Sequence, residues 1–217
     1  MTIVKLCGLT NLDDALCAVE AGADLLGFIL YPRSPRYIEP QNLSAIVAAV
    51  HTVKPEITTV GVFVNETPER ILDVLSTTGL TLAQLSGDEP LSHLTALQGR
   101  TYKVVRTREQ ADAVISALTP LHRPPRLPCP DLMLDADHPA LYGGSGAKAD
   151  ESLAASLGRS RRLLLAGGLT PDNVAQAMQQ AQPWGVDVSS GVEASPGRKD
   201  HDRIRSFIQA VRRQDGR

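Results

Sequence analysis

The sequence predicts a (β/α)8 barrel, in which eight parallel strands form a closed ring inside a layer of helices. Short Val, Ile and Leu runs alternate with longer amphipathic segments along the whole chain, which is the pattern of βα units. This alternation can be followed through eight units. The chain has 217 residues, near the lower limit of about 200 for such barrels. We therefore assign residues 1–217 to a single domain.

Each strand is predicted where an apolar, β-branched run is bounded by turn residues. The eight predicted strands are 2–7, 24–30, 57–64, 81–85, 101–106, 131–136, 162–167 and 185–189. Helical segments fill the gaps between them. An open doubly wound sheet is the alternative fold, but no Gly-x-Gly-x-x-Gly follows the first strand to support dinucleotide binding.

Capping residues indicate where several helices start and stop. Asn11 can cap the first helix and Gly22 can end it. The segments 67–69 and 170–172 both read Thr-Pro-acidic, which places a capping Thr before a Pro at the first helical position. We expect a helix to start at each of these two segments.

Composition narrows the classes of partner. The formal net charge is −2 and no long basic run is present, so the chain lacks the electrostatic footprint of a protein that binds nucleic acid or an anionic membrane. The three cysteines are scattered, which argues against a disulfide framework and a structural zinc site. No apolar stretch approaches the roughly 20 residues of a membrane span. We expect a cytoplasmic protein that acts on a small molecule.

The segment 119–130 contains five prolines and cannot be a helix or a central strand. It precedes the sixth predicted strand, so we expect a stiff loop on the amino-terminal face of the barrel. Catalytic residues of such barrels lie on the opposite, carboxyl-terminal rim. We therefore expect Cys129 and His122, both within this segment, to have no role in chemistry.

Two candidates for acid–base chemistry end predicted strands at the catalytic rim. Cys7 closes the first apolar run and Asp135 closes the sixth. A thiol and a carboxyl can divide the work of a general base and a general acid. The residues alone leave two structural alternatives open, because Cys7 can be a small buried filler and Asp135 can cap the following helix.

Seven motifs follow one another in barrel order and extend the rim. They are K-L-C-G-L-T, A-G-A-D-L-L-G-F-I-L-Y-P-R-S-P-R-Y-I, V-G-V-F-V-N, L-D-A, G-G-S-G, L-A-G-G-L-T-P-D-N-V and V-D-V-S-S-G-V-E. Together they make the chain similar to the phosphoribosylanthranilate isomerases of tryptophan biosynthesis over nearly its whole length.

The resemblance implies an isomerase that opens the ribose ring of N-(5-phosphoribosyl)anthranilate and completes an Amadori rearrangement to a deoxyribulose ketone. It implies no cofactor and no metal. Asp135 would be the general acid that protonates the ring oxygen, and Cys7 the general base that takes the proton from the ribose C2. Lys5 lies two residues before Cys7 on the same face of the strand, so its charge is expected to favour the thiolate.

The resemblance also implies residues that hold the two anionic ends of the substrate. Arg36 resembles the clamp for the anthranilate carboxylate, a task that suits a planar guanidinium. Arg33 is the nearby alternative. The phosphate would lie over Gly168, Ser190 and Gly191, supported by Gly167 and Ser189. Asp187 would accept hydrogen bonds from ribose hydroxyls.

Two further segments bear on this site. The family often has His where this chain has Ser86, and Ser cannot shuttle protons near neutral pH, so Ser86 is left out of the catalytic set. The glycine-rich segment 143–146 is expected to form a lid over the substrate.

Alternative functions remain open at this point. A bifunctional barrel of the tryptophan and histidine pathways, or the related histidine-pathway isomerase, would apply the same chemistry to a substrate with two phosphates. A non-catalytic phosphosugar-binding barrel is the non-enzyme alternative, and intact Cys7 and Asp135 argue against it. We expect a monomer, with a homodimer as the alternative.

Overall fold

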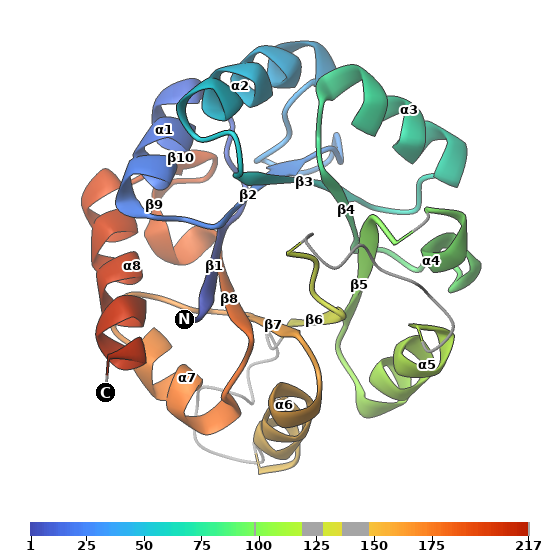
Figure 1. Cartoon of the computed structure of the whole chain (residues 1–217), viewed down its shortest axis with the longest axis vertical. Coiled ribbons are helices and arrows are strands. Elements are labelled where there is room, and N and C mark those ends of the chain that lie inside the picture. The colour runs from blue at the N-terminus through green and yellow to red at the C-terminus, as the bar shows by residue number, and fades with distance from the viewer. Residues whose placement is uncertain (98, 119–127, 136–147, 217) are drawn as a thin grey trace.

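The computed structural model describes residues 1–97, 99–118, 128–135 and 148–216, with the backbone alone for 148–151. Eight parallel strands, β1 to β8, pair in sequence order and β1 pairs with β8, so the ring is closed. Helices surround this ring in chain order (Figure 1). The (β/α)8 prediction is confirmed.

The strands of the barrel begin and end within one residue of the ranges predicted for them. Their bounds are β1 Ile3–Leu6, β2 Leu25–Ile29, β3 Thr58–Phe63, β4 Leu82–Leu85, β5 Thr101–Val105, β6 Leu132–Asp135, β7 Leu163–Ala166 and β8 Gly185–Val188. The agreement arises because each strand is an apolar run with a polar or glycine-containing boundary on both sides.

The helices occupy the gaps between strands. Their bounds are α1 Leu12–Ala21, α2 Pro40–Val53, α3 Pro68–Thr78, α4 Ser92–Ala96, α5 Arg108–Leu118, α6 Lys148–Ser160, α7 Val174–Ala181 and α8 His201–Asp215.

Three of the predicted caps are confirmed and one helix start was wrong. Asn11 accepts from the backbone N–H of Asp14 and Gly22 ends α1 in the left-handed region, while Thr67 accepts from the N–H of Arg70. By contrast, α7 begins at Val174 rather than at the 170–172 segment. The reason is that the backbone N–H of Thr170 donates to Asn173 Oδ1 at 2.8 Å, which closes a turn ahead of the helix.

Side chains alternate between two hydrophobic clusters. Val4 and Leu6 of β1 point outward into the large cluster shared with the helices, which leaves Lys5 facing the barrel interior. A second cluster fills that interior with inward residues of the strands. Its members are Leu25, Val60, Leu82, Tyr102, Val104, Cys129, Met133, Leu164 and Ala166.

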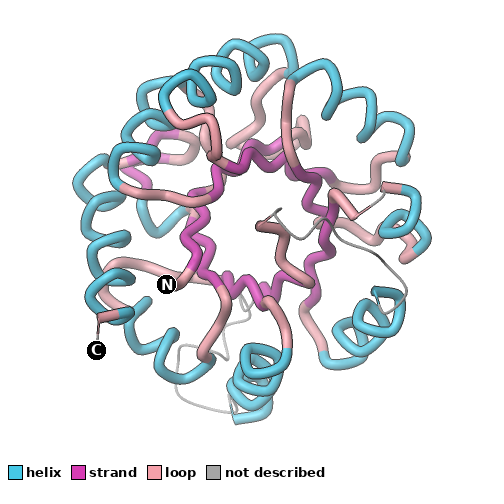
Figure 2. Tube along the Cα trace, viewed as in Figure 1, coloured by secondary structure: helices cyan, strands magenta, loops and turns pink. Residues whose placement is uncertain are grey.

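The segment just before β6, residues 128–131, lies inside the ring of strands (Figure 2). Cys129, on this segment, is 1% exposed and packs in the interior cluster. Cys129 is thus a core residue, and its expected lack of a role in chemistry stays a prediction. Residues 119–127, which include His122, lie outside the described residues, as does the predicted lid at 143–146.

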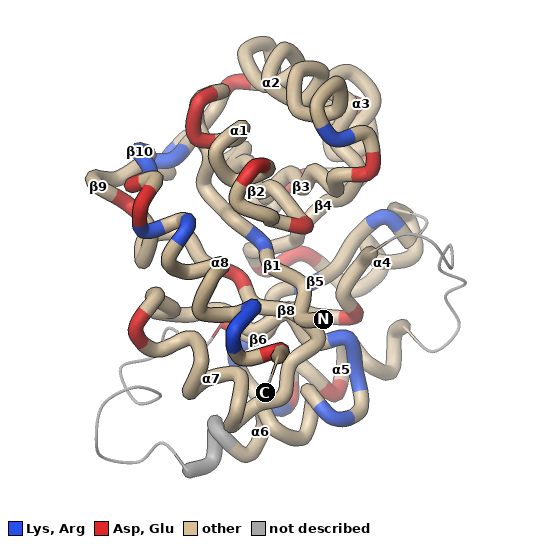
Figure 3. Tube along the Cα trace, turned by 60° about the vertical axis from the view of Figure 1, so that its left-hand side comes forward, with Lys and Arg blue, Asp and Glu red and all other residues tan. Residues whose placement is uncertain are grey.

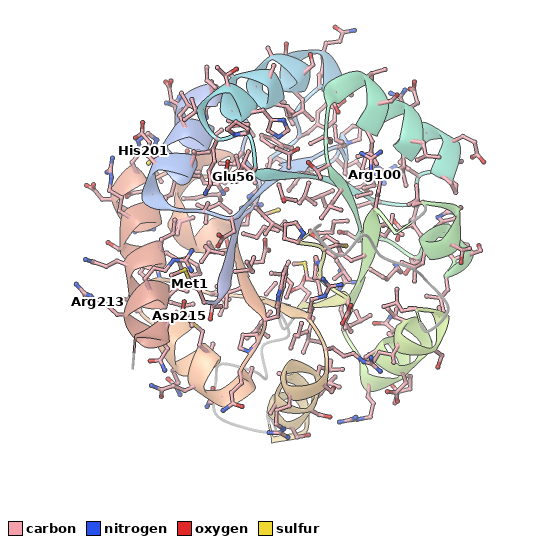
Figure 4. The ribbon with its side chains drawn as sticks, in the orientation of Figure 1. Met1, Glu56, Arg100, His201, Arg213 and Asp215 are labelled. Carbon is pink, nitrogen blue, oxygen red and sulfur yellow. The ribbon has the colours of Figure 1, made fainter. Side chains whose placement is uncertain are left out.

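The two ends of the chain meet beside the junction of β1 and β8. Asp215 at the end of α8 accepts from Thr2 N at 2.9 Å and from Thr2 Oγ1 at 2.6 Å. Figure 4 labels Met1 and Asp215 close together, with Glu56 and Arg100 on the same amino-terminal side of the ring. The contact ties the last helix to the first strand.

The outer surface carries charges of both signs. In the side view, Lys and Arg are interspersed with Asp and Glu along the helices (Figure 3). This mixed pattern agrees with the near-neutral net charge. No helix in the described ranges is long and apolar enough to cross a membrane.

One element was not predicted. After β8, a single 3₁₀ turn at Ser190–Val192 leads into a small antiparallel hairpin of β9 (Glu193–Ser195) and β10 (Arg198–Lys199). The hairpin lies outside the barrel beside α1 and α8 (Figure 1). Its strands are only three and two residues long, too short for a periodicity argument to find.

Candidate active site at the carboxyl-terminal rim

The predicted acid and the predicted base both lie on the inward-facing side of their strands, at the carboxyl-terminal end. Asp135 ends β6 two residues after Met133, which belongs to the interior cluster. Cys7 lies two residues after the inward Lys5 of β1 and is 5% exposed. Because inward residues alternate along a strand, both side chains belong to the mouth of the barrel at its carboxyl-terminal end.

A glycine on β2 makes room for the thiol. A Cβ atom on Gly27 would lie 2.8 Å from Cys7 Sγ and 3.1 Å from Lys5 Cε. Both approaches are closer than van der Waals contact allows. The glycine of the A-G-A-D-L-L-G-F motif therefore lets Cys7 and Lys5 pack side by side against β2.

Lys5 is fully buried and pairs with a carboxylate across the strand junction. Its Nζ lies 2.6 Å from Asp187 Oδ1, and the two residues are direct register partners of β1 and β8. Burial alone would lower the pKa of Lys5, but the Asp187 carboxylate and the nearby Cys7 outweigh it and hold that pKa above its usual value. Lys5 is therefore a permanent cation.

Lys5 favours the Cys7 thiolate, in the direction expected, but burial has the larger effect on this thiol. Burial raises the pKa of the Cys7 thiol above its usual value, and the lowering effect of Lys5 is too small to reverse it. Asp187 also raises this pKa while it neutralises Lys5. The protonated thiol is consequently the main form of Cys7 near neutral pH.

A cavity of about 210 Å³ opens at this rim between β6, β7 and β8. It collects seven of the nine predicted site residues. The lining residues are Arg36, Met133, Asp135, Ala166, Gly167, Gly168, Leu169, Asp187, Val188, Ser189 and Ser190. The other two predicted residues lie next to the lining. Cys7 is close to Lys5 and to the lining residue Asp187, and Gly191 follows the lining residue Ser190 in the chain.

The part of the cavity made by the loops after β7 and β8 has the properties of an anion cradle. Gly167 and Gly168 both have positive φ, at 98° and 60°, a conformation that glycine adopts without strain. A Cβ atom on Gly191 would lie 1.9 Å from the Leu169 carbonyl oxygen, so the two loops pack backbone to backbone. The buried Oγ of Ser189 has no hydrogen-bond partner within the described part of the chain.

Arg36 has a partner that sequence reasoning missed. Its Nε and Nη2 atoms donate to the two carboxylate oxygens of Glu193, at 2.8 and 2.6 Å. Glu193 also accepts from Lys199 Nζ at 3.0 Å, and Lys199 donates to the Ser189 carbonyl at 3.0 Å. The charged residues of 193–199 could have indicated such a partner in the sequence. They point to Arg36 only once the β9–β10 hairpin is known, and that hairpin was not predicted. Arg33, the alternative clamp, is exposed and does not line the cavity.

Ser86 belongs to a hydrogen-bonded chain that starts inside the barrel. Tyr102 donates to Gln84 Oε1 at 2.9 Å, and Gln84 Nε2 donates to Ser86 Oγ at 3.0 Å. The serine is thus held by its neighbour on β4. That Ser86 has no part in catalysis stays a prediction.

Backbone N–H groups of the loops after β3 and β4 converge on one carboxylate. Asn65 N and Gly87 N both donate to Glu89 Oε1, at 2.8 and 3.1 Å. Lys103 Nζ contacts the other oxygen of this carboxylate at 2.7 Å. The donors that converge here are already used by a buried side chain of the protein itself.

Two other cavities lie against this part of the rim. They have volumes of about 280 and 410 Å³ and are lined from β5, α5 and the loops after β3 and β4. Neither contains a predicted site residue. Within the described ranges, no group of three or more His, Cys, Asp or Glu side chains is placed to hold a metal ion.

Comparisons with known proteins agree with this geometry. A protein-family model described as N-(5'-phosphoribosyl)anthranilate (PRA) isomerase matches residues 4–210. The isomerase of that name from Trichlorobacter lovleyi is 44% identical over 210 residues, which are 96% of this chain and 97% of that protein. The crystal structure of phosphoribosyl anthranilate isomerase from Thermotoga maritima superposes with a TM-score of 0.81 at 43% identity, covering 98% of this chain and 99% of that one.

A second related structure contains a ligand. It is a phosphoribosyl anthranilate isomerase in complex with reduced 1-(o-carboxyphenylamino)-1-deoxyribulose 5-phosphate. It matches at a TM-score of 0.77 and 40% identity, over 98% of this chain and 99% of that one.

Proposed function

Because the chain belongs to the N-(5'-phosphoribosyl)anthranilate isomerase family, we propose that it converts N-(5'-phosphoribosyl)anthranilate to 1-(o-carboxyphenylamino)-1-deoxyribulose 5-phosphate in tryptophan biosynthesis. The observation that carries the proposal is the rim cavity, which brings together an acid, an anion cradle and an arginine in a chain related to these enzymes over almost its whole length. Cys7 adjoins this set on the neighbouring strand β1.

Asp135 is the group that starts the reaction in this proposal. Its carboxyl proton passes to the ribose ring oxygen while the C1–O bond breaks. The lone pair of the anthranilate nitrogen forms a C1=N bond, which gives a protonated Schiff base. The position of Asp135 on the wall of the cavity supports this role.

Cys7 carries out the second proton transfer. Its thiolate takes the proton from C2, the C2–H electrons form a C1=C2 bond and the nitrogen becomes neutral. The resulting enolamine tautomerises to the ketone, so the overall reaction is an isomerisation. Since burial raises the pKa of the thiol, only a minor fraction of the free enzyme carries this base near neutral pH.

The two anionic ends of the substrate are held on different loops. The phosphate lies over Gly168, Ser190 and Gly191, with Gly167 and Ser189 supporting the turn. The orphaned Ser189 Oγ and the close approach of the loops after β7 and β8 support this placement.

The opposite end of the substrate meets Arg36, which takes the anthranilate carboxylate. Asp187 accepts from a ribose hydroxyl through the oxygen that Lys5 does not contact. This arrangement places the reacting C1 and C2 atoms between the phosphate cradle and the arginine.

We further propose that the chain is one domain, works in the cytoplasm and is a monomer, with a homodimer as the alternative. All three cysteines are buried and none is in a disulfide, which suits a reducing compartment. The enzyme from Thermotoga maritima is described as dimeric. Sedimentation equilibrium of the purified chain decides between the two assemblies.

Complementation tests the proposed function. The gene for this chain is expressed in a host that lacks its own phosphoribosylanthranilate isomerase, on medium without tryptophan. We expect growth with the wild-type chain and none with Asp135→Asn. Failure of the wild-type chain to restore growth, although it accumulates as folded protein, would contradict the proposal.

A further inference from the structure

Glu193 holds one edge of the Arg36 guanidinium. A guanidinium has five N–H donors and two edges that can each bind a carboxylate in a bidentate way. Glu193 occupies the edge formed by Nε and Nη2, at 2.8 and 2.6 Å. The end-on edge, formed by Nη1 and Nη2, is not used by this pair. Arg36 is 21% exposed and lines the rim cavity, so this edge is the one available to a ligand.

Glu193 is itself held in place by hydrogen-bond donors of the hairpin that it begins. It is 5% exposed, and its Oε1 accepts from Lys199 Nζ at 3.0 Å and from Gly197 N at 3.3 Å. These donors belong to the β9–β10 hairpin. The arginine that follows β2 is thus oriented by an element that follows β8.

Lys199 connects this arrangement to the phosphate cradle. Its buried Nζ donates to the Ser189 carbonyl at 3.0 Å as well as to Glu193. Gly8 packs between the two ends, because a Cβ atom there would lie 2.7 Å from Arg36 Cδ and 2.8 Å from Ser189 Oγ. The carboxylate clamp and the phosphate cradle therefore share one support.

We propose that Glu193 is a positioning residue that holds Arg36 with its end-on edge toward the cavity, and that Lys199 links this clamp to the phosphate cradle. The inference rests on the proposed function, since it assigns the anthranilate carboxylate to Arg36. The trio carries two positive charges and one negative charge, hence a net charge of +1 that favours an anionic ligand. Glu193 sets where that charge is directed.

The direction of the change in KM separates positioning from electrostatics. Glu193→Gln raises the net charge of the trio to +2, so a purely electrostatic role would lower KM for the anionic substrate. The amide also presents an NH₂ group to the Arg36 donors and breaks their bidentate contact. A positioning role therefore raises KM, by roughly tenfold, with a smaller change in kcat. Glu193→Asp keeps the negative charge but moves the carboxylate away from Arg36 by the length of one methylene. We expect KM to rise in this variant too.

A double-mutant cycle shows whether Glu193 acts through Arg36. In an Arg36→Met background, Glu193→Gln should change KM no further, because the group that it orients is gone. Glu56→Gln, an exposed carboxylate on the far face of the barrel, is the matched control and should leave both constants unchanged.

An unchanged or lower KM in Glu193→Gln, or a rise in KM that persists in the Arg36→Met background, would overturn the proposal. So would failure of both Glu193 variants to fold, which would give this residue a structural role only. Absence of turnover in the wild-type chain would instead contradict the proposed function, so the two failures are distinguishable.

Discussion

At the scale of single residues, the mouth of the barrel places a buried thiol beside a buried lysine that is already neutralised. Lys5 lies 2.6 Å from Asp187, whose opposite charge offsets part of the stabilisation that Lys5 gives to a Cys7 thiolate. Sequence reasoning found Lys5 and Asp187 separately. It could not find their pairing, because the partners are 182 positions apart and meet only when β1 closes against β8.

The pH dependence of catalysis follows from this arrangement. Since burial raises the pKa of Cys7, the thiolate fraction of the free enzyme grows with pH beyond the usual thiol range of about 8.5. We expect kcat/KM, which reports the free enzyme, to keep rising above that pH. Lys5→Met removes a charge that lowers the thiol pKa and should move this limb to higher pH. A pH–rate profile that is flat from pH 7 to 9 in both proteins would rule out Cys7 as the titrating base.

Asp135→Asn should lower kcat by about 10²- to 10⁴-fold, the usual contribution of a general acid. The amide keeps the shape of the side chain and loses only its transferable proton, so the reduced product analogue should still bind. Steady-state kinetics and titration with the analogue measure the two effects. Asp131→Asn, just outside the same strand, is the matched control. Full turnover in purified Asp135→Asn would remove this residue from the mechanism.

At the scale of elements, the strands were predictable and the short connections were not. Each barrel strand is an apolar run that can be recognised from its own residues. At the start of α1 and of α3, the side chain of the capping residue accepts a hydrogen bond from the first turn of the same helix. The start of α7 was misplaced because Asn173 captures the Thr170 N–H instead. The β9–β10 hairpin depends on contacts with Arg36 and other distant residues, which leave no local pattern in the sequence.

The packing of the loops after β7 and β8 leads to a prediction at this scale. Gly191→Ala puts a methyl group 1.9 Å from the Leu169 carbonyl oxygen, so the cradle must open. We expect a higher KM for the phosphorylated substrate and a lower Tm. Gly216→Ala is the control, because its Cβ would meet nothing closer than 3.8 Å. Wild-type KM in Gly191→Ala would place the phosphate elsewhere.

At the scale of the whole molecule, the closed barrel decides which distant residues share a site. The βα alternation predicted eight strands, and a closed ring brings the ends of β1, β6, β7 and β8 to one rim. Most of the candidate site came from the resemblance to the isomerase family, and the closed ring explains why seven of its nine predicted residues line one cavity. What the fold alone does not give is the set of buried ion pairs, because these depend on side-chain directions after the ring has closed.

Substrate selectivity is a property of the whole rim. The proposed phosphate cradle lies over β7 and β8, while the backbone donors on the β3 and β4 side are used by the buried Glu89 carboxylate. A substrate with two phosphates would find no free N–H groups here, because they already donate to Glu89, which is itself paired with Lys103 at 2.7 Å. We therefore expect no detectable turnover of the bisphosphorylated histidine-pathway intermediate. Comparable kcat/KM on both substrates would reveal a second anion site.

The central claim is that this rim isomerises phosphoribosylanthranilate through Cys7 and Asp135. Its most direct test is the conversion of N-(5'-phosphoribosyl)anthranilate by the purified chain, corrected for spontaneous hydrolysis and compared with Cys7→Ser. A hydroxyl is a far weaker base than a thiolate, so we expect saturable turnover by the wild type and a loss of about 10²- to 10⁴-fold in the variant. Wild-type turnover in folded Cys7→Ser, or no turnover in the wild-type chain, would contradict the account.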